Sequence, residues 1–160
     1  MTFKLSRSSL NKLTGVHPLL VEVVKTAIKN TTVDFGVIYG VRTVSEQKAL
    51  FEKGASQTMR SAHLVQPDGY AHAVDLMAYV GSRHSWELSL YDNLADAMKL
   101  AAKEHSAHIR WGGAWTADDL RKWPGTMEAA MNDYIDTRRS QKRRPFIDGP
   151  HFELRSTGSA

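Results

Sequence analysis

AVDLMAY, at residues 73–79, is the stretch of sequence from which the fold can be predicted. It is apolar apart from Asp75 and contains no Gly or Pro, which indicates a strand. Because side chains alternate along a strand, Val74 and Leu76 share one face and Asp75 points to the other. A buried carboxylate needs a cation or hydrogen-bond donors nearby. Asp75 is therefore a candidate functional residue.

Elements of both kinds are expected on either side of this strand. Apolar residues at helical spacing predict a helix over 90–104. A capping box that pairs Thr43 with Glu46 predicts another helix over 44–53. Helices and strands do not alternate regularly, so we predict an α+β fold in which helices flank a mostly antiparallel sheet. The other expected helices are 18–29, 117–123 and 126–141, and the other expected strands are 33–41, 107–111 and 150–154.

The composition limits the class of protein. A chain of 160 residues fits one domain, at about 150 residues per domain. The absence of cysteine excludes a disulfide framework, cysteine-ligated zinc and a thiol nucleophile. No stretch has the apolar character of a signal peptide or a membrane span, so we expect synthesis in the cytoplasm and no membrane partner.

The formal charge is +4, and five cations gather near the C-terminus. Such a run is usually a solvated helix end, but it also suits an anionic partner. We call it the basic run; it consists of Arg138, Arg139, Lys142, Arg143 and Arg144.

Three segments concentrate residue types that bind metals: 61–63, 72–75 and 148–151. Catalytic zinc takes about three His, Asp or Glu ligands and leaves one position for water. A nearby carboxylate can then accept the proton of that water. These segments therefore contain enough groups for metal-assisted hydrolysis, with either His63 or His72 as a ligand. The remaining histidines have no such companions in the sequence and are interpreted as structural or surface residues: His17, His84, His105 and His108.

The motifs around these segments resemble a known family. SAHL at 61–64 followed by AHAVDLMAY at 71–79 resembles the signature S-x-H-x-x-G-x-A-x-D of the zinc D-Ala-D-Ala carboxypeptidases. The sequence is most similar to the branch of phage endolysins that are L-alanyl-D-glutamate endopeptidases. DGPHFEL at 148–154 resembles the second metal motif of that family, and GVRT at 40–43 also fits. The resemblance covers nearly the whole chain and implies a catalytic domain over 1–155 with a tail over 156–160.

The resemblance also implies roles for individual residues. Asp148 matches the catalytic acid/base. Arg42 matches the arginine that binds substrate and stabilises the developing oxyanion, and Ser61 matches a serine that contacts the substrate or supports the metal site. The site is expected on the sheet, with one Zn²⁺ per chain and the ligands His63, Asp75 and His151.

This sequence departs from the family signature between its first histidine and its aspartate. Residues 65–69 are interpreted as an insertion, and Pro-Asp-Gly within them is typical of a turn. Ala71 then takes the place of the motif glycine. His72 matches a position that does not bind metal, and strand alternation turns it away from Asp75, which favours His63 as the ligand.

Two further departures lie later in the chain. Ala114, within WGGAW at 111–115, stands where relatives often have Asp. The segment 126–144 is longer than in many relatives and is interpreted as a helical elaboration that leans over the cleft, contacts the wall or has no role.

The expected function is zinc-dependent hydrolysis of the L-alanyl-D-glutamate bond in peptidoglycan. We expect a monomeric phage lysis enzyme that is made in the cytoplasm of the infected bacterium and reaches the periplasmic wall after release. A D-Ala-D-Ala carboxypeptidase or dipeptidase with the same site is the alternative. Nucleic-acid binding is not expected, because only Tyr134 and Phe146 lie near the basic run as stacking aromatics. An inactive wall-binding module is disfavoured because the four residues of the metal site are all present.

Overall fold

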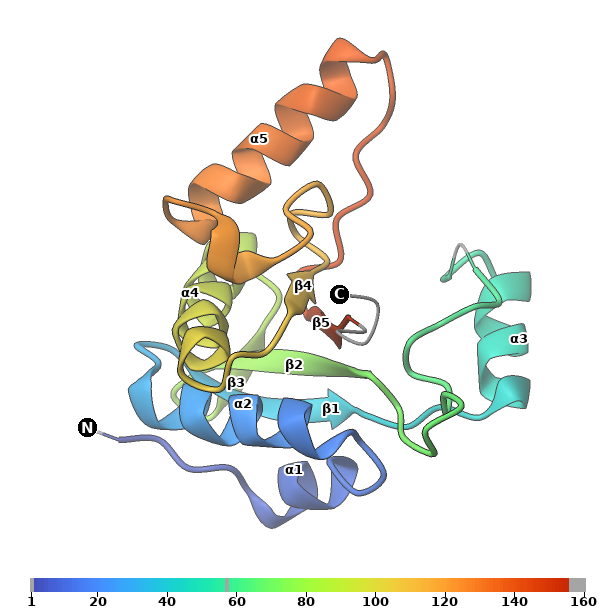
Figure 1. The fold of residues 1–160 in the computed structure, drawn as a ribbon, viewed down its shortest axis with the longest axis vertical. Helices are drawn as coiled ribbons and strands as arrows, with labels where there is room; N and C mark the ends of the chain where they lie inside the picture. The colour runs from blue at the N-terminus through green and yellow to red at the C-terminus, as the bar shows by residue number, and fades with distance from the viewer. Residues whose placement is uncertain (1, 57, 156–160) are drawn as a thin grey trace.

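The computed structural model describes residues 2–56 and 58–155, so the expected tail at 156–160 lies outside the described residues. The described strands form one sheet in the order β1-β2-β5-β4, and β3 pairs with β2 beyond the region that β5 covers (Figure 1). Every pair is antiparallel, which confirms the α+β prediction. The strands are β1 (Asp34–Tyr39), β2 (Ala73–Val80), β3 (Arg83–Ser85), β4 (Ile109–Trp111) and β5 (His151–Leu154).

Helices cover the sheet unevenly. α2 and α4 pack against each other and enclose the main hydrophobic core with the sheet. α5 extends from α4 on one side of the molecule, while α3 stands apart on the other (Figure 1). None of the described helices is long and apolar enough to span a membrane. The helices are α1 (Arg7–Lys12), α2 (Pro18–Asn30), α3 (Val44–Glu52), α4 (Leu88–Glu104), the 3₁₀ helix η1 (Leu120–Lys122) and α5 (Met127–Ser140).

The strand β2 has the two faces that its sequence predicts. Val74, Leu76 and Ala78 are buried in the core. Asp75 faces away from that core, and in the ladder it pairs with Tyr39 of β1 and His151 of β5. The strand therefore places one carboxylate in the middle of the sheet.

Several elements differ from the sequence predictions. The strand expected over 33–41 ends at Tyr39, and the following Gly40 packs so closely on the carbonyl of Lys12 that no Cβ would fit. The helix expected over 117–123 is only the 3₁₀ turn η1. Asp119 caps that turn, and Trp123 is extended because it precedes a proline. α1 and β3 were not predicted, since elements of 6 and 3 residues are too short to show a periodic apolar pattern.

Candidate metal and catalytic site

His63 is fixed by the loop that precedes β2. Its backbone N–H donates to Ser61 Oγ at 3.1 Å, and its carbonyl accepts from the backbone N–H of Arg42 at 2.9 Å. The ring is almost completely buried, and Nδ1–H donates to the carbonyl of Gly40 at 2.8 Å. This hydrogen bond leaves Nε2 facing Asp75 Oδ1 at 3.1 Å.

His151 approaches the same carboxylate oxygen from β5. Its Nδ1 lies 3.3 Å from Asp75 Oδ1, and Nε2–H donates to Glu153 at 2.8 Å. Although burial opposes a charge on the ring, Asp75 and Glu153 raise the pKa of His151 to about 10. Nδ1, the nitrogen that faces Asp75, is the one that would bind a cation in place of a proton.

These three side chains form a buried group with the chemistry of a metal site. One ligand atom from each of His63, Asp75 and His151 lies within 4.8 Å of the others. Burial raises the pKa of Asp75, but hydrogen bonds from His151 and His63 outweigh it and hold that pKa well below its usual range. The outer nitrogens of both rings bind Gly40 and Glu153, as is typical of histidines that ligate metals. The group is therefore suited to a small divalent cation such as zinc.

Asp148 lies at the edge of this group. The backbone N–H of His151 donates to its carbonyl at 3.1 Å, so Asp148-Gly149-Pro150-His151 forms a turn. Gly112 lets the turn approach closely, because a Cβ there would collide with the Asp148 carbonyl. Burial, together with the negative charge of Asp75, raises the pKa of Asp148 above its usual value. Such a carboxyl can exchange a proton closer to neutral pH.

Arg42 faces the same group from the segment between β1 and α3. Its Nη2 lies 3.7 Å from Asp75 Oδ2, and Nη1 donates to Gln47 Oε1 at 2.8 Å. Gln47 is fully buried, and its Nε2 donates to Ser56 and to the carbonyl of Thr58. Gln47 thus holds Arg42 in place. This role of Gln47 cannot be predicted from the sequence, because a single Gln in a helix is usually exposed.

A cleft of about 530 Å³ opens over these residues, between the side of α3 and the side of α5. Ser61 lines it together with His63. Arg138 of the basic run also lines it, whereas the other four cations of the run are exposed. The opposite walls consist of Leu50, Ala55, Ser56, Thr58, Arg60 and Ala62 on the α3 side, and of Trp115, Tyr134, Arg138 and Phe146 on the α5 side.

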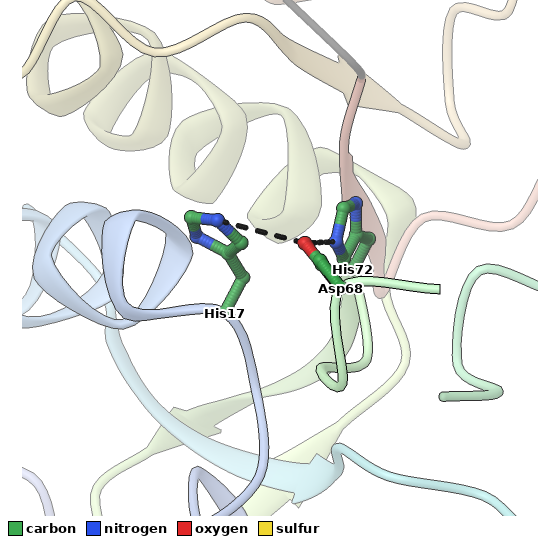
Figure 2. A group of neighbouring side chains, drawn as sticks. All are labelled: His17, Asp68 and His72. Atoms are coloured by element: carbon green, nitrogen blue, oxygen red, sulfur yellow. Dashed lines mark hydrogen bonds and ion pairs between the residues drawn. The ribbon is translucent and has the colours of Figure 1, made fainter. Parts of the chain in front are cut away.

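His72 lies apart from this site, in a second group with His17 and Asp68 (Figure 2). Its Nε2 is 2.7 Å from Asp68 Oδ2, and Nε2 of His17 is 3.8 Å from the same oxygen. The expectation that His17 has no companions was therefore wrong. Asp68 comes from residues 65–69, where a Gln66-to-Gly69 hydrogen bond closes the expected turn. The contact between His17 and Asp68 depends on the geometry of the loop, which the spacing of residues in the sequence does not reveal.

The second group differs from the first in the hydrogen bonds of its histidines. Nδ1 of His17 accepts the backbone N–H of Leu19 at 3.1 Å and so caps α2. The proton of the neutral ring therefore sits on Nε2, the nitrogen that faces Asp68. A metal on Nε2 would require the opposite tautomer and the loss of this cap. We interpret the group of His17, Asp68 and His72 as a structural contact that links the 65–69 loop to the start of α2.

Comparisons with known proteins identify the family of this chain. The sequence model of the family described as phage L-alanyl-D-glutamate peptidase matches residues 1–155. The L-alanyl-D-glutamate peptidase of Escherichia phage T5 is 27% identical over 158 residues, which cover 96% of this chain and 99% of the relative. That of Listeria phage A118 is 37% identical over 76 residues, or 48% of this chain and 24% of the relative.

A solved structure shares the fold over most of its length. The crystal structure of the Serratia marcescens L-Ala D-Glu endopeptidase ChiX superposes with a TM-score of 0.67 at 31% sequence identity. The match covers 95% of this chain and 90% of ChiX. With a family match that spans nearly every residue, the chain belongs to the phage L-alanyl-D-glutamate peptidase family.

Proposed function

We propose that this protein is a zinc-dependent endopeptidase that hydrolyses the L-alanyl-D-glutamate bond of bacterial peptidoglycan during phage lysis. The main support is the buried group of His63, Asp75 and His151, whose rings are held from outside by Gly40 and Glu153. The similar proteins named above are L-alanyl-D-glutamate peptidases, which favours this bond over the terminal D-Ala-D-Ala bond.

The donor set fits one zinc ion per chain. His63 would bind through Nε2, His151 through Nδ1 and Asp75 through a carboxylate oxygen, and the open cleft leaves room for water and substrate. When bound, zinc polarises a carbonyl oxygen and lowers the pKa of a coordinated water. All of these residues come from a single chain, so we propose that the monomer is active.

Asp148 is the proposed general base and then the general acid. Its carboxyl lines the cleft beside the ligand group, and its raised pKa suits a group that takes up and releases a proton. It would accept a proton from the attacking water and donate it to the leaving amine of the glutamate residue. The turn that leads into His151 keeps the carboxyl near the ligands without making it one of them.

Arg42 and Ser61 are proposed to bind the substrate. The guanidinium of Arg42, oriented by Gln47, would donate hydrogen bonds to the oxygen that becomes negative when the carbonyl is attacked. Ser61 Oγ accepts the backbone N–H of His63, and its hydroxyl proton remains available for a substrate carbonyl at the cleft wall.

A pair of histidine variants tests the proposed zinc site. His63→Ala should lose zinc and all turnover of a peptidoglycan peptide, whereas the matched control His72→Ala should keep its zinc and at least most of its turnover. Metal content is measured on the purified proteins together with peptide cleavage. Full zinc occupancy in His63→Ala, or loss of zinc in His72→Ala, would contradict the proposal.

A further inference from the structure

The wall of the cleft formed by α5 has no role in the mechanism described so far. Tyr134 and Arg138 of α5, with Phe146 from the segment that follows, line the same cleft as the ligand group. In Figure 1, α5 extends away from the sheet, and the segment that follows it runs back to β5. The predicted elaboration over 126–144 therefore faces the site and is not a remote decoration.

Hydrogen bonds and ring contacts fix this wall to the site. Tyr134 Oη donates to the carbonyl of Phe146 at 3.1 Å and accepts its N–H at 3.0 Å. Trp115 Nε1–H donates to the same carbonyl at 2.9 Å, and the Trp115 ring lies 5.6 Å from that of His151. Tyr134 of α5 is thus held at a fixed position relative to His151, a proposed zinc ligand.

Arg138 is the cation that this wall presents to the cleft. Its guanidinium carbon lies 5.5 Å from the centre of the Tyr134 ring, a cation–π contact that orients the group without neutralising it. Among the other arginines of the cleft, Arg42 and Arg155 pair with carboxylates, and Arg110 donates to the carbonyl of Trp115. Arg60 is exposed on the opposite wall, on the α3 side of the cleft. Within the described residues no carboxylate lies within ion-pair distance of Arg138.

The substrate of the proposed function has a carboxylate that can pair with Arg138. The scissile nitrogen belongs to a glutamate residue, which has two carboxyl groups, and a peptide that continues beyond it uses one of them. The other is a free carboxylate beside the scissile bond, unless it is amidated. We propose that Arg138 binds this carboxylate and selects stem peptides in which it is free. The inference rests on the proposed function.

Two soluble peptides test the inference; they are identical except that this carboxylate is free in one and a carboxamide in the other. The wild-type enzyme should cleave the free acid with a kcat/KM about 10–100-fold higher, the typical worth of one charge-assisted hydrogen bond. Arg138→Gln should lose most of this preference by slowing only the free acid. Arg138→Lys should retain part of it, because a single ammonium cannot form the bidentate pair of a guanidinium.

Arg139→Gln is the matched control, since Arg139 is the exposed neighbour in the same run and is not part of the cleft. It should keep the wild-type preference. Zinc content and the melting temperature show that each variant is folded. If Arg138→Gln keeps the wild-type ratio of kcat/KM for the two peptides, or cleaves both peptides more slowly by the same factor, the inference is overturned while the proposed function stays intact. A wild-type enzyme that cleaves neither peptide would refute the proposed function, and the inference with it.

Discussion

His151 donates a hydrogen bond of 2.8 Å from Nε2–H to the buried carboxylate of Glu153, two residues further along β5. Both side chains lie on the same face of the strand, because side chains two residues apart in a strand point in the same direction. This bond turns Nδ1 of His151 toward Asp75. Glu153 thus sets which nitrogen of the ring faces the proposed zinc site.

We therefore expect Glu153→Gln to weaken zinc binding by about 10–100-fold, the usual effect of losing a carboxylate behind a ligating histidine. Competition with a chelator measures the affinity, and Glu22→Gln, an exposed change on α2, is the control. Unchanged affinity together with lost turnover would instead identify Glu153 as the catalytic base.

Arg42→Ala should fold and retain zinc but lose about 10²–10³-fold in kcat, the typical contribution of one oxyanion donor. The protein should remain folded because Arg42 lies at the cleft and not in the core. Steady-state kinetics on a soluble peptide measure the effect, with the exposed Arg83→Ala on β3 as the control. A change in KM alone would place Arg42 in substrate binding and remove it from stabilisation of the oxyanion.

Asp148→Asn should leave zinc bound and reduce turnover by about 10²–10⁴-fold, because an amide can neither accept the proton of water nor return it to the amine. The amide is nearly isosteric, and the turn is held by backbone hydrogen bonds that it does not disturb. Zinc content and turnover are measured on the same sample. Retained zinc with turnover within a few-fold of wild type would show that Asp148 only supports the turn.

Asp92 lies outside the site and is expected to make the stability of the protein depend on pH. Its side chain is buried on α4, and burial, with the nearby carboxylates of Glu128 and Asp96, raises its pKa from 3.8 to about 6. The folded state then binds the proton more tightly than the unfolded chain does, so stability falls as the pH rises from about 4 to 6.

Asp92→Asn should consequently melt at a higher temperature than wild type at pH 7.5, and the difference should disappear below pH 4. Thermal unfolding followed by circular dichroism measures this, and Asp133→Asn on the exposed face of α5 is the control. A gain in stability that is equal at both pH values would show that ionisation of Asp92 is not its cause.

The sequence predicts the strand of Asp75 and the helix α4 from their apolar patterns, and the helix α3 from its capping box. The resemblance of its motifs to the family also points to the three residues that the fold brings together, whereas the residue types alone leave His63 and His72 as alternatives. The sequence does not reveal Gln47 behind Arg42, His17 beside His72, or the position of Arg138 in the cleft. These contacts depend on how loops and α5 are placed in space, and no local periodicity encodes that placement.

The central claim is tested most directly by mass spectrometry of the fragments that the zinc-loaded protein releases from purified peptidoglycan, with Asp148→Asn as the inactive control. The account predicts stem peptides that begin with a free glutamate amine, together with glycan chains whose side branches each end in an alanine with a free carboxyl group. Release of terminal D-alanine alone, or no fragments at all from the zinc-loaded wild-type protein, would contradict it.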